Sequence, residues 1–383
     1  MPRPTVACSE TGDPLLLTPG PLTTSKTVKQ AMVHDWGSRD ATFIGINKSV
    51  LERLPRILNG AGDFVTVPMQ GSGTFAVEAM LTTFIPRDGK VLLLVNGAYG
   101  QRAKKICEIA GRAVIVHETP EDTPPDLVAV EATLKNDKAI THVFVVQCET
   151  TSGILNPVAK VAELVARQGR RLLVDSMSAF GALLLDARTV QFDAVAASSN
   201  KCIEGVPGLG FVICRKTALE ATKGNATTLV LDLHDQWANF GKTGQYRFTP
   251  PIHVIVAFHQ ALEEFDAEGG VAGRGGRYAE NCRILIDGMR ALGFEPLLPE
   301  ALQAPIIVTF RMPADKNFVF QTFYDKLKDR GYVIYPGKLT VADSFRIGCI
   351  GRLYPENMRG ALAAIRDILD EMGVRSLKAT KAA

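Results

Sequence analysis

Residues 193–216 read DAVAASSNKCIEGVPGLGFVICRK and carry the clearest indication of the fold. The stretch holds two short apolar runs, Asp193 to Ser199 and Leu209 to Cys214, which are separated by a turn rich in glycine and proline. Runs that are apolar on both faces are typical of strands buried between helices. Lys201 begins the turn, so a long cationic side chain lies at the end of a buried strand. A lysine in such a turn is more often solvated, and its role depends on its neighbours.

The same pattern continues on both sides of this stretch. From about residue 64 to 215, short strands rich in valine and leucine alternate with helices. This alternation predicts an α/β fold with a mainly parallel sheet flanked by helices. After residue 250, long helical segments replace it, the second of them running from about Arg274 to Leu292. We therefore predict a large domain over residues 15–270 and a smaller C-terminal α+β domain over residues 271–375.

The totals exclude several classes of protein. With 383 residues, two domains are expected, and the net charge of +3 gives no reason to expect nucleic acid or an acidic membrane as a partner. We expect no membrane helix, because no apolar stretch approaches roughly 18 residues, and no signal peptide, because the N-terminal residues contain no apolar h-region. The seven cysteines form no CxxC pair. We expect reduced thiols, no metal site and a cytoplasmic location.

Ligands of an open α/β sheet bind beyond the carboxyl ends of its strands, so the residues that follow each strand matter most. The segment QGSGTFAVEAM, residues 70–80, begins a helix with Ser72, Gly73 and Thr74 in its first turn. Free N–H groups and the helix dipole at that position attract a phosphate group. A helix cap without a ligand is the alternative.

Three other strands deliver polar side chains to the same edge. Tyr99 can stack on a flat ligand or simply pack, and the hydroxyls of Thr150, Thr151 and Ser152 can bind a ligand or form a turn. Asp175 ends an apolar strand, where a buried carboxylate needs a partner unless it only caps a helix.

Together these strand ends describe a site for pyridoxal phosphate. They supply a phosphate cradle, a stacking ring, hydroxyls for a phenolic oxygen, an acid for a ring nitrogen and, in Lys201, an amine for the aldehyde. The glycine spacing matches neither GxGxxG nor a P-loop, which disfavours a dinucleotide or ATP.

Ten segments carry a resemblance to a known family. They are LLLTPGPLTTSKTVKQAM, DWGSRD, QGSGTFAVEAML, VNGAYGQR, ETTSGILNP, VDSMSAFG, SSNKCIEGVPG, YRFTPPIH, VIYPGK and FRIGCIG, between residues 15 and 351. Through them the chain resembles the fold-type I, class V aminotransferases that use pyridoxal phosphate. DWGSRD, SSNKCIEGVPG and LLLTPGPLTTS are similar to a narrower group that acts on an aminophosphonate.

The resemblance implies roles for the matching residues. Lys201 would form the imine with the cofactor, Asp175 would pair with its ring nitrogen, and Tyr99 would stack on the ring. Thr150 would contact the ring oxygen, with Thr151 and Ser152 as the alternatives for this contact. The complete set of implied cofactor contacts is Ser72, Gly73, Thr74, Tyr99, Thr150, Asp175, Ser198, Lys201 and Thr249.

The resemblance also implies a homodimer with shared active sites, in which Thr249 reaches the phosphate of the neighbouring subunit. Arg346 would bind the acidic group of the substrate, Gly20 would line the substrate cavity, and Arg39 would be a second anion contact. Judged from the residues alone, Arg346 is better explained as a surface ion pair.

The implied reaction transfers the amino group of 2-aminoethylphosphonate to pyruvate and yields phosphonoacetaldehyde and L-alanine. Three alternatives stay open. One is an aminotransferase of the same class with alanine or serine as donor and glyoxylate or pyruvate as acceptor. Another is a cysteine desulfurase or lyase, for which Cys349 is the candidate thiol. The last is a protein that binds the cofactor without turnover.

Overall fold

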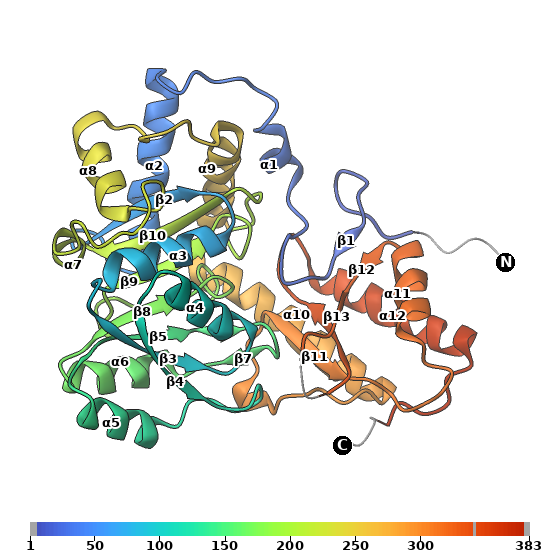
Figure 1. The fold of residues 1–383 in the computed structure, drawn as a ribbon. Helices are drawn as coiled ribbons and strands as arrows, with labels where there is room; N and C mark the ends of the chain where they lie inside the picture. Colours follow the sequence, from blue (N-terminus) through green and yellow to red (C-terminus); the bar gives the residue numbers. More distant parts are fainter. Residues whose placement is uncertain (1–5, 340–341, 379–383) are drawn as a thin grey trace.

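A seven-stranded sheet forms the centre of the large domain in the computed structural model, which describes residues 6–339 and 342–378 (Figure 1). The strand order is β2-β10-β9-β8-β5-β3-β4. The strands are β2 (Phe64–Gln70), β3 (Lys90–Val95), β4 (Ala113–Glu118), β5 (Ile140–Val146), β8 (Arg171–Asp175), β9 (Ala194–Ser198) and β10 (Leu209–Arg215). Only β10 runs against its neighbours, because the turn from β9 is too short for a parallel crossover. The predicted mainly parallel sheet is confirmed.

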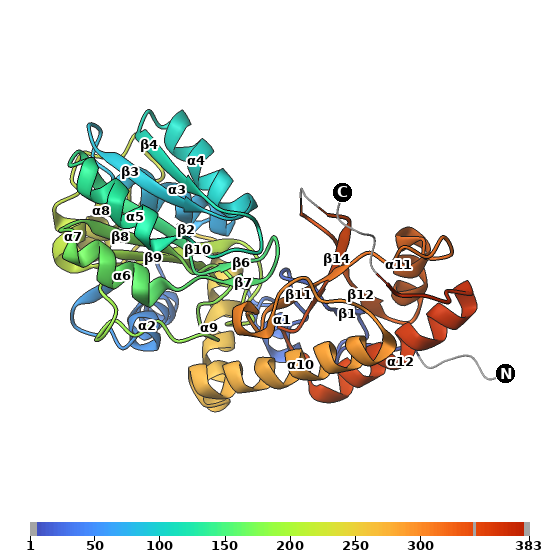
Figure 2. The same ribbon diagram turned by 90° about the horizontal axis from the view of Figure 1, so that it is seen from below.

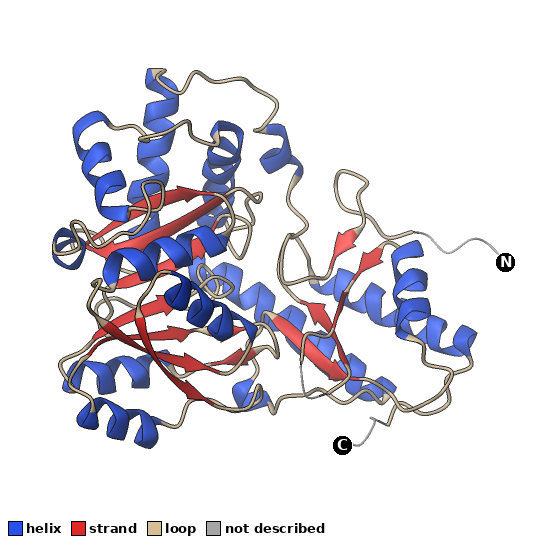
Figure 3. Ribbon diagram, in the orientation of Figure 1, coloured by secondary structure: helices blue, strands red, loops and turns tan. Residues whose placement is uncertain are grey.

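Helices cover both faces of this sheet, as Figure 3 shows. Side chains of a strand alternate between faces, so Leu92 and Leu94 belong to one hydrophobic cluster and Val91 and Leu93 to the other. The first face packs on α2 (Ala41–Ile57), α5 (Leu127–Asn136), α6 (Val158–Arg167) and α9 (Ile252–Ala267). The second packs on α3 (Gly73–Phe84), α4 (Ala98–Ile109), α7 (Lys216–Glu220) and α8 (Leu233–Thr243).

The small domain has its own antiparallel sheet and aromatic core. Its strand order is β11-β14-β13, and Phe345 in β14 contacts the rings of Phe294, Phe310 and Phe323. Its elements are β11 (Ile307–Arg311), β13 (Tyr335–Pro336), β14 (Ser344–Gly348), α10 (Gly270–Leu292), α11 (Phe320–Asp329) and α12 (Pro355–Met372). Among the described residues, we find no helix with the length and apolar character needed to cross a membrane.

Helix α10 joins the two domains. In Figure 2 it runs from beside α9 along the small domain. It begins at Gly270, earlier than the predicted start near Arg274. The reason is tertiary packing: a Cβ at Gly275 would collide with the Ala182 carbonyl, so glycine permits a close approach to the large domain.

The N-terminal segment connects the domains a second time. Its strand β1 (Leu15–Leu16) pairs in parallel with β12 (Tyr332–Val333), and the side chains of Leu15 and Leu17 lie in the small-domain core. The segment then crosses to the large domain, where α1 (Lys26–Gln30) packs on α9. The predicted boundary between the domains at residues 270 and 271 stays a prediction. Leu15 and Leu17, which the prediction assigned to the large domain, pack in the small-domain core.

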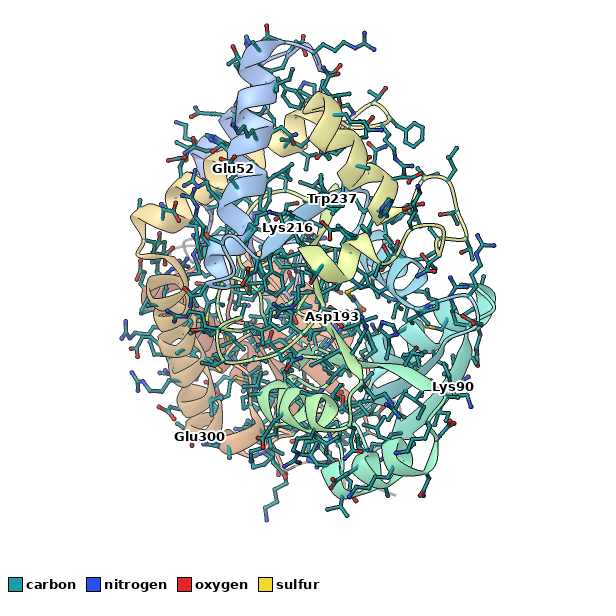
Figure 4. The ribbon with its side chains drawn as sticks, turned by 90° about the vertical axis from the view of Figure 1, so that its left-hand side faces the viewer. Glu52, Lys90, Asp193, Lys216, Trp237 and Glu300 are labelled. Atoms are coloured by element: carbon teal, nitrogen blue, oxygen red, sulfur yellow. The ribbon has the colours of Figure 1, made fainter. Side chains whose placement is uncertain are left out.

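The carboxyl ends of β2, β8 and β9 meet at the edge of the sheet that faces the small domain. Figure 4 views the molecule from the left-hand side of Figure 1, which is the side away from the small domain. It labels Asp193, which precedes β9, and Lys216, which follows β10. Those two residues mark the far edge, so the predicted ligand side lies between the domains.

Candidate active site

One cavity of about 460 Å³ lies at this carboxyl edge. It brings together eight residues that the sequence analysis singled out: Ser72, Gly73, Thr74, Tyr99, Thr150, Asp175, Ser198 and Lys201. They come from the ends of different strands and the starts of different helices, so only the folded sheet makes them neighbours.

Lys201 lies at the start of the turn after β9 and is partly buried. Its amine donates a hydrogen bond to the carbonyl of Pro19 in the N-terminal segment. Gly20 has φ +121°, and a Cβ at this position would collide with the Lys201 amine, so glycine is needed there. Burial lowers the pKa of Lys201, although Tyr99 and Asp175 partly oppose this effect. The site therefore favours the neutral amine more than water does.

Asp175 is the last residue of β8, and only 4% of its surface is exposed. Its Oδ1 accepts a hydrogen bond from the Met177 N–H at 2.9 Å, and no described residue forms an ion pair with it. Burial raises its pKa to about 6, and the negative charge of Glu149 adds to this, while Arg102 and Lys201 lower it. Asp175 caps no described helix and suits a cationic ligand atom.

The start of α3 has the features of an anion site. Ser72 is the N-cap residue, but its side chain makes no capping hydrogen bond and stays free for a ligand. Gly73 packs so closely on Met177 that a Cβ would collide with its sulfur. Across the cavity, the buried Ser198 hydroxyl has no hydrogen-bond partner among the described residues.

Glu149 does not line the cavity but positions residues that do, and it was not predicted from the sequence. Its buried carboxylate accepts hydrogen bonds from the N–H groups of Tyr99 and Gly100 at 3.1 and 3.3 Å, and from the Thr151 hydroxyl at 2.6 Å. These bonds hold the start of α4, and therefore the Tyr99 ring, against the turn that bears Thr150. A carboxylate at the end of an apolar strand was the available signal, as it was for Asp175.

Arg346 lies in β14 of the small domain with only 5% of its surface exposed. Its Nη1 donates to the Thr150 carbonyl at 2.8 Å and its Nε to the Pro336 carbonyl at 3.1 Å. Among the described residues no carboxylate forms an ion pair with it, and burial lowers its pKa. The interpretation of Arg346 as a surface ion pair is therefore wrong. A buried cation held by two carbonyls suits an anionic ligand.

Two further cations surround Tyr99. The Lys338 ammonium lies 4.2 Å from the ring centroid, and the Arg102 guanidinium carbon lies 5.0 Å from it. Arg102 also donates to the Thr74 hydroxyl at 3.2 Å. Arg102 follows Tyr99 by three residues on one helix, which is a signal that sequence could have supplied. Lys338 belongs to the small domain, and its distance from Tyr99 along the sequence gave no indication that the two side chains meet.

Arg39 and Thr249 are not brought to the Lys201 cavity within one chain. They line a separate cavity of about 350 Å³, together with Tyr246 and Phe248. Cys349 is buried in the small-domain core rather than in the Lys201 cavity. A hydrogen bond with Cys282 and burial raise its thiol pKa, which argues against a nucleophilic role.

Comparisons with known proteins agree with this geometry. The family model for class V aminotransferases matches residues 41–328. The chain is 55% identical over 362 residues to a 2-aminoethylphosphonate–pyruvate transaminase of Cupriavidus taiwanensis, covering 94% of this chain and 96% of that protein. It is 53% identical over 361 residues to one of Pseudomonas putida, covering 94% and 98%.

Solved structures confirm the predicted fold-type I architecture. The pyridoxamine–pyruvate aminotransferase of Mesorhizobium loti superposes with a TM-score of 0.86 at 24% identity, covering 96% of this chain and 95% of that one. An aspartate aminotransferase of Thermus thermophilus gives 0.84 at 22% identity, covering 94% and 99%. The chain belongs to the class V aminotransferase family.

Proposed function

We propose that the protein transfers the amino group of 2-aminoethylphosphonate to pyruvate, which yields phosphonoacetaldehyde and L-alanine. The observation that carries this proposal is the buried Arg346 guanidinium, which has no acidic partner among the described residues and adjoins the Lys201 cavity through Thr150. The names of relatives at 53–55% identity support the same donor and acceptor. No observation favours alanine or serine as donor, a lyase, or a protein without turnover.

Pyridoxal phosphate is the proposed cofactor, and the residues of the cavity fit it. Asp175 supplies a buried carboxylate for a cationic ring nitrogen, and Lys201 supplies an amine of lowered pKa for an aldehyde. The free Ser72 hydroxyl and the N–H groups at the start of α3 suit a phosphate group. The unpartnered Ser198 hydroxyl offers one more hydrogen bond. When bound, this cofactor takes up the electron pair that is left when a proton leaves the neighbouring carbon.

The chain's own residues perform the proton transfers and the binding. When it is not bound to the cofactor, the Lys201 amine takes the proton from the carbon that bears the substrate nitrogen. It can act as this base because desolvation lowers the pKa of the amine and favours its neutral form. A positioned base of this kind typically contributes about 10²–10⁴-fold. The Asp175 carboxylate holds a protonated ring nitrogen in place by its charge.

Arg346 serves both half-reactions. Its planar guanidinium offers parallel donors to a phosphonate in one half-reaction and to a carboxylate in the other. The two carbonyls that hold Nε and Nη1 fix the direction in which the remaining donors point. Lys338 and Arg102 add positive charge nearby, which suits a phosphonate that carries more than one negative charge.

A homodimer in which each chain completes the other's site is part of the proposal. Thr249 and Arg39 lie away from Lys201 of their own chain. Apolar side chains lie exposed near both cavities: Phe248 beside Thr249, and Phe75 in the first turn of α3. In the proposed dimer, we expect the partner subunit to cover these two rings. A cytoplasmic location also belongs to the proposal and rests on the cysteine pattern.

Purified protein supplied with pyridoxal phosphate, 2-aminoethylphosphonate and pyruvate should form alanine and phosphonoacetaldehyde. The Lys201→Ala variant should lose steady turnover by at least about 10²-fold, because it lacks the base that moves the proton. Alanine release measured by chromatography tests both statements, with cofactor absorbance as the control for binding. A variant with unimpaired turnover would remove Lys201 from its assigned role.

Arg346→Lys should raise KM for both 2-aminoethylphosphonate and pyruvate by about 10- to 100-fold, because lysine keeps the charge but loses the paired donors. Steady-state kinetics with each substrate varied in turn measures the change. Arg311→Lys is the matched control, because Arg311 lies on the neighbouring strand and pairs with Glu295. A loss confined to pyruvate would mean that another residue, such as Arg39, holds the phosphonate.

Mixing two inactive variants tests the shared site. Lys201→Ala removes the base, and Thr249→Asp places a negative charge beside the phosphate of the partner's cofactor. A mixed dimer of the two keeps one intact site, so random pairing should restore about a quarter of wild-type activity. Activity after mixing and re-association, compared with each variant alone, measures this. No gain above the separate variants would contradict sharing.

Asp175→Asn should stabilise the cofactor-free protein above about pH 6. The unfolded carboxyl loses its proton near 3.8 and the folded one near 6, so the folded state binds more protons between them and its stability falls as the pH rises. That difference corresponds to roughly 3 kcal/mol, which the neutral amide avoids. Thermal unfolding at pH 8 should show a higher midpoint for the variant, with equal midpoints near pH 4. An unchanged difference across this range would contradict the burial of the charge.

A further inference from the structure

A largely buried ion cluster adjoins the turn that begins at Lys201, and none of its residues lines the Lys201 cavity. It consists of Glu204, Glu268, Arg274, Arg277 and Tyr278, and we call it the Glu204 cluster. Glu204 is 2% exposed, and Arg274 and Tyr278 are fully buried. Two glutamates face two arginines, so the charges balance inside the protein.

Glu204 has an unusual backbone. Its φ of +63° lies in the left-handed region, which disfavours every residue except glycine and, to a lesser extent, asparagine and aspartate. Its N–H donates to the Lys201 carbonyl at 2.7 Å, so this conformation closes the turn that begins at Lys201. A glutamate in a position that suits glycine points to a need for its carboxylate.

The carboxylate binds the turn to helix α10. Oε1 of Glu204 accepts hydrogen bonds from the Tyr278 hydroxyl at 2.5 Å and from Nη2 of Arg277 at 2.8 Å. Arg274, one turn earlier on α10, donates to the Cys202 carbonyl at 2.6 Å. The turn after Lys201 is therefore held at two points, Cys202 and Glu204.

The same side chains of α10 also hold the loop that follows β14. Nη1 of Arg277 donates to the carbonyls of Gly351 and Leu353 at 2.6 and 2.8 Å. The Tyr278 hydroxyl accepts from the Gly351 N–H at 3.1 Å. This loop begins just beyond the strand that bears Arg346. The Glu204 cluster thus joins the Lys201 turn of one domain to the Arg346 strand of the other.

The N-terminal segment makes a second connection on the cavity side. The Leu17 carbonyl accepts from the Gly348 N–H at 2.9 Å, and the Pro19 carbonyl accepts from the Lys201 amine. The second bond uses the reactive amine itself and is lost when that amine binds a ligand. The Glu204 cluster does not use the Lys201 amine, so we expect this connection to persist during turnover.

We propose that Glu204 is a positioning residue that sets the separation between the Lys201 amine and the Arg346 guanidinium and so limits the length of the amino donor. This inference rests on the proposed function. The donor must present its amine near Lys201 while its acidic group reaches Arg346. The proposal requires a separation that admits two carbons between these groups and excludes a third.

The test compares 2-aminoethylphosphonate with 3-aminopropylphosphonate, both with pyruvate as acceptor. Glu204→Gln keeps an oxygen that can accept hydrogen bonds but removes the charge that holds Arg277. It should shift the ratio of kcat/KM toward the longer donor by about 10-fold, the effect of losing one charge-assisted hydrogen bond. Tyr278→Phe keeps the ion pairs of Glu204 with Arg274 and Arg277, so it should shift the ratio in the same direction by a smaller factor. This second variant tests the proposal if Glu204→Gln does not fold.

A second readout needs no turnover. Hydrogen–deuterium exchange of the cofactor-free variants should rise together in residues 202–206 and 349–353, because one cluster holds both segments. Leu369→Ala is the control: it opens a cavity in the small-domain core without touching the cluster, so it should lower stability and leave the donor ratio unchanged.

An unchanged donor ratio in both cluster variants, with normal cofactor absorbance, would overturn the positioning role, and so would faster exchange confined to residues 202–206. Failure of the wild type to use 2-aminoethylphosphonate would instead reject the proposed function. In that case alanine and β-alanine, which also differ by one carbon between amine and acid, replace the two phosphonates as donors. The positioning role is then judged by the same shift in ratio.

Discussion

The structure depends on one constraint: charged groups buried at the carboxyl edge of the sheet lack partners of their own. Asp175 has no cation in ion-pair contact and Arg346 no acid, in the part of the chain that the structure describes. The Lys201 amine donates a hydrogen bond to the Pro19 carbonyl, and no carboxylate of residues 6–339 and 342–378 forms an ion pair with it. Burying such groups without a partner disfavours folding, so the arrangement is understandable only if ligands complete it. A cationic ring nitrogen, an aldehyde and an oxyanion are the three matching chemistries.

The location of these groups between two domains explains why the connections matter. Lys201 and Asp175 belong to the large sheet, whereas Arg346 belongs to the small one. Helix α10 and the N-terminal segment each run from one domain to the other. Each also forms hydrogen bonds with residues of both the large and the small domain. Gly275, near the start of α10, allows the backbone to approach Ala182, and the flanking Arg274 and Arg277 hold Glu204. Helix α10 therefore both joins the domains and fixes the distance between them.

Sequence was sufficient for what is local. The strands and the residues just beyond them could be predicted, because strand period and turn chemistry are encoded within a few positions; Lys201 and Asp175 are examples. The burial of Arg346 could not, because it depends on how a strand of the small domain meets Thr150, 196 residues earlier. Glu204 and Tyr278, 74 residues apart, show the same difficulty. Arg39 and Thr249 stay predictions, because their roles depend on a second chain.

The phosphonate and the carboxylate that this site is proposed to bind differ in charge and in their distance from the carbon that loses or gains the amino group. Arg346 and Lys338 differ in how freely they can adjust to this difference. Arg346 is held by two carbonyls and can offer only its remaining donors, in a fixed direction. Lys338 has a flexible stem and is only partly buried, so its ammonium can follow an additional negative charge. If both ligands share the Arg346 guanidinium, the longer-stemmed Lys338 ammonium beside it would allow the site to bind a carboxylate or a phosphonate without rearranging the sheet that holds Asp175 and Lys201.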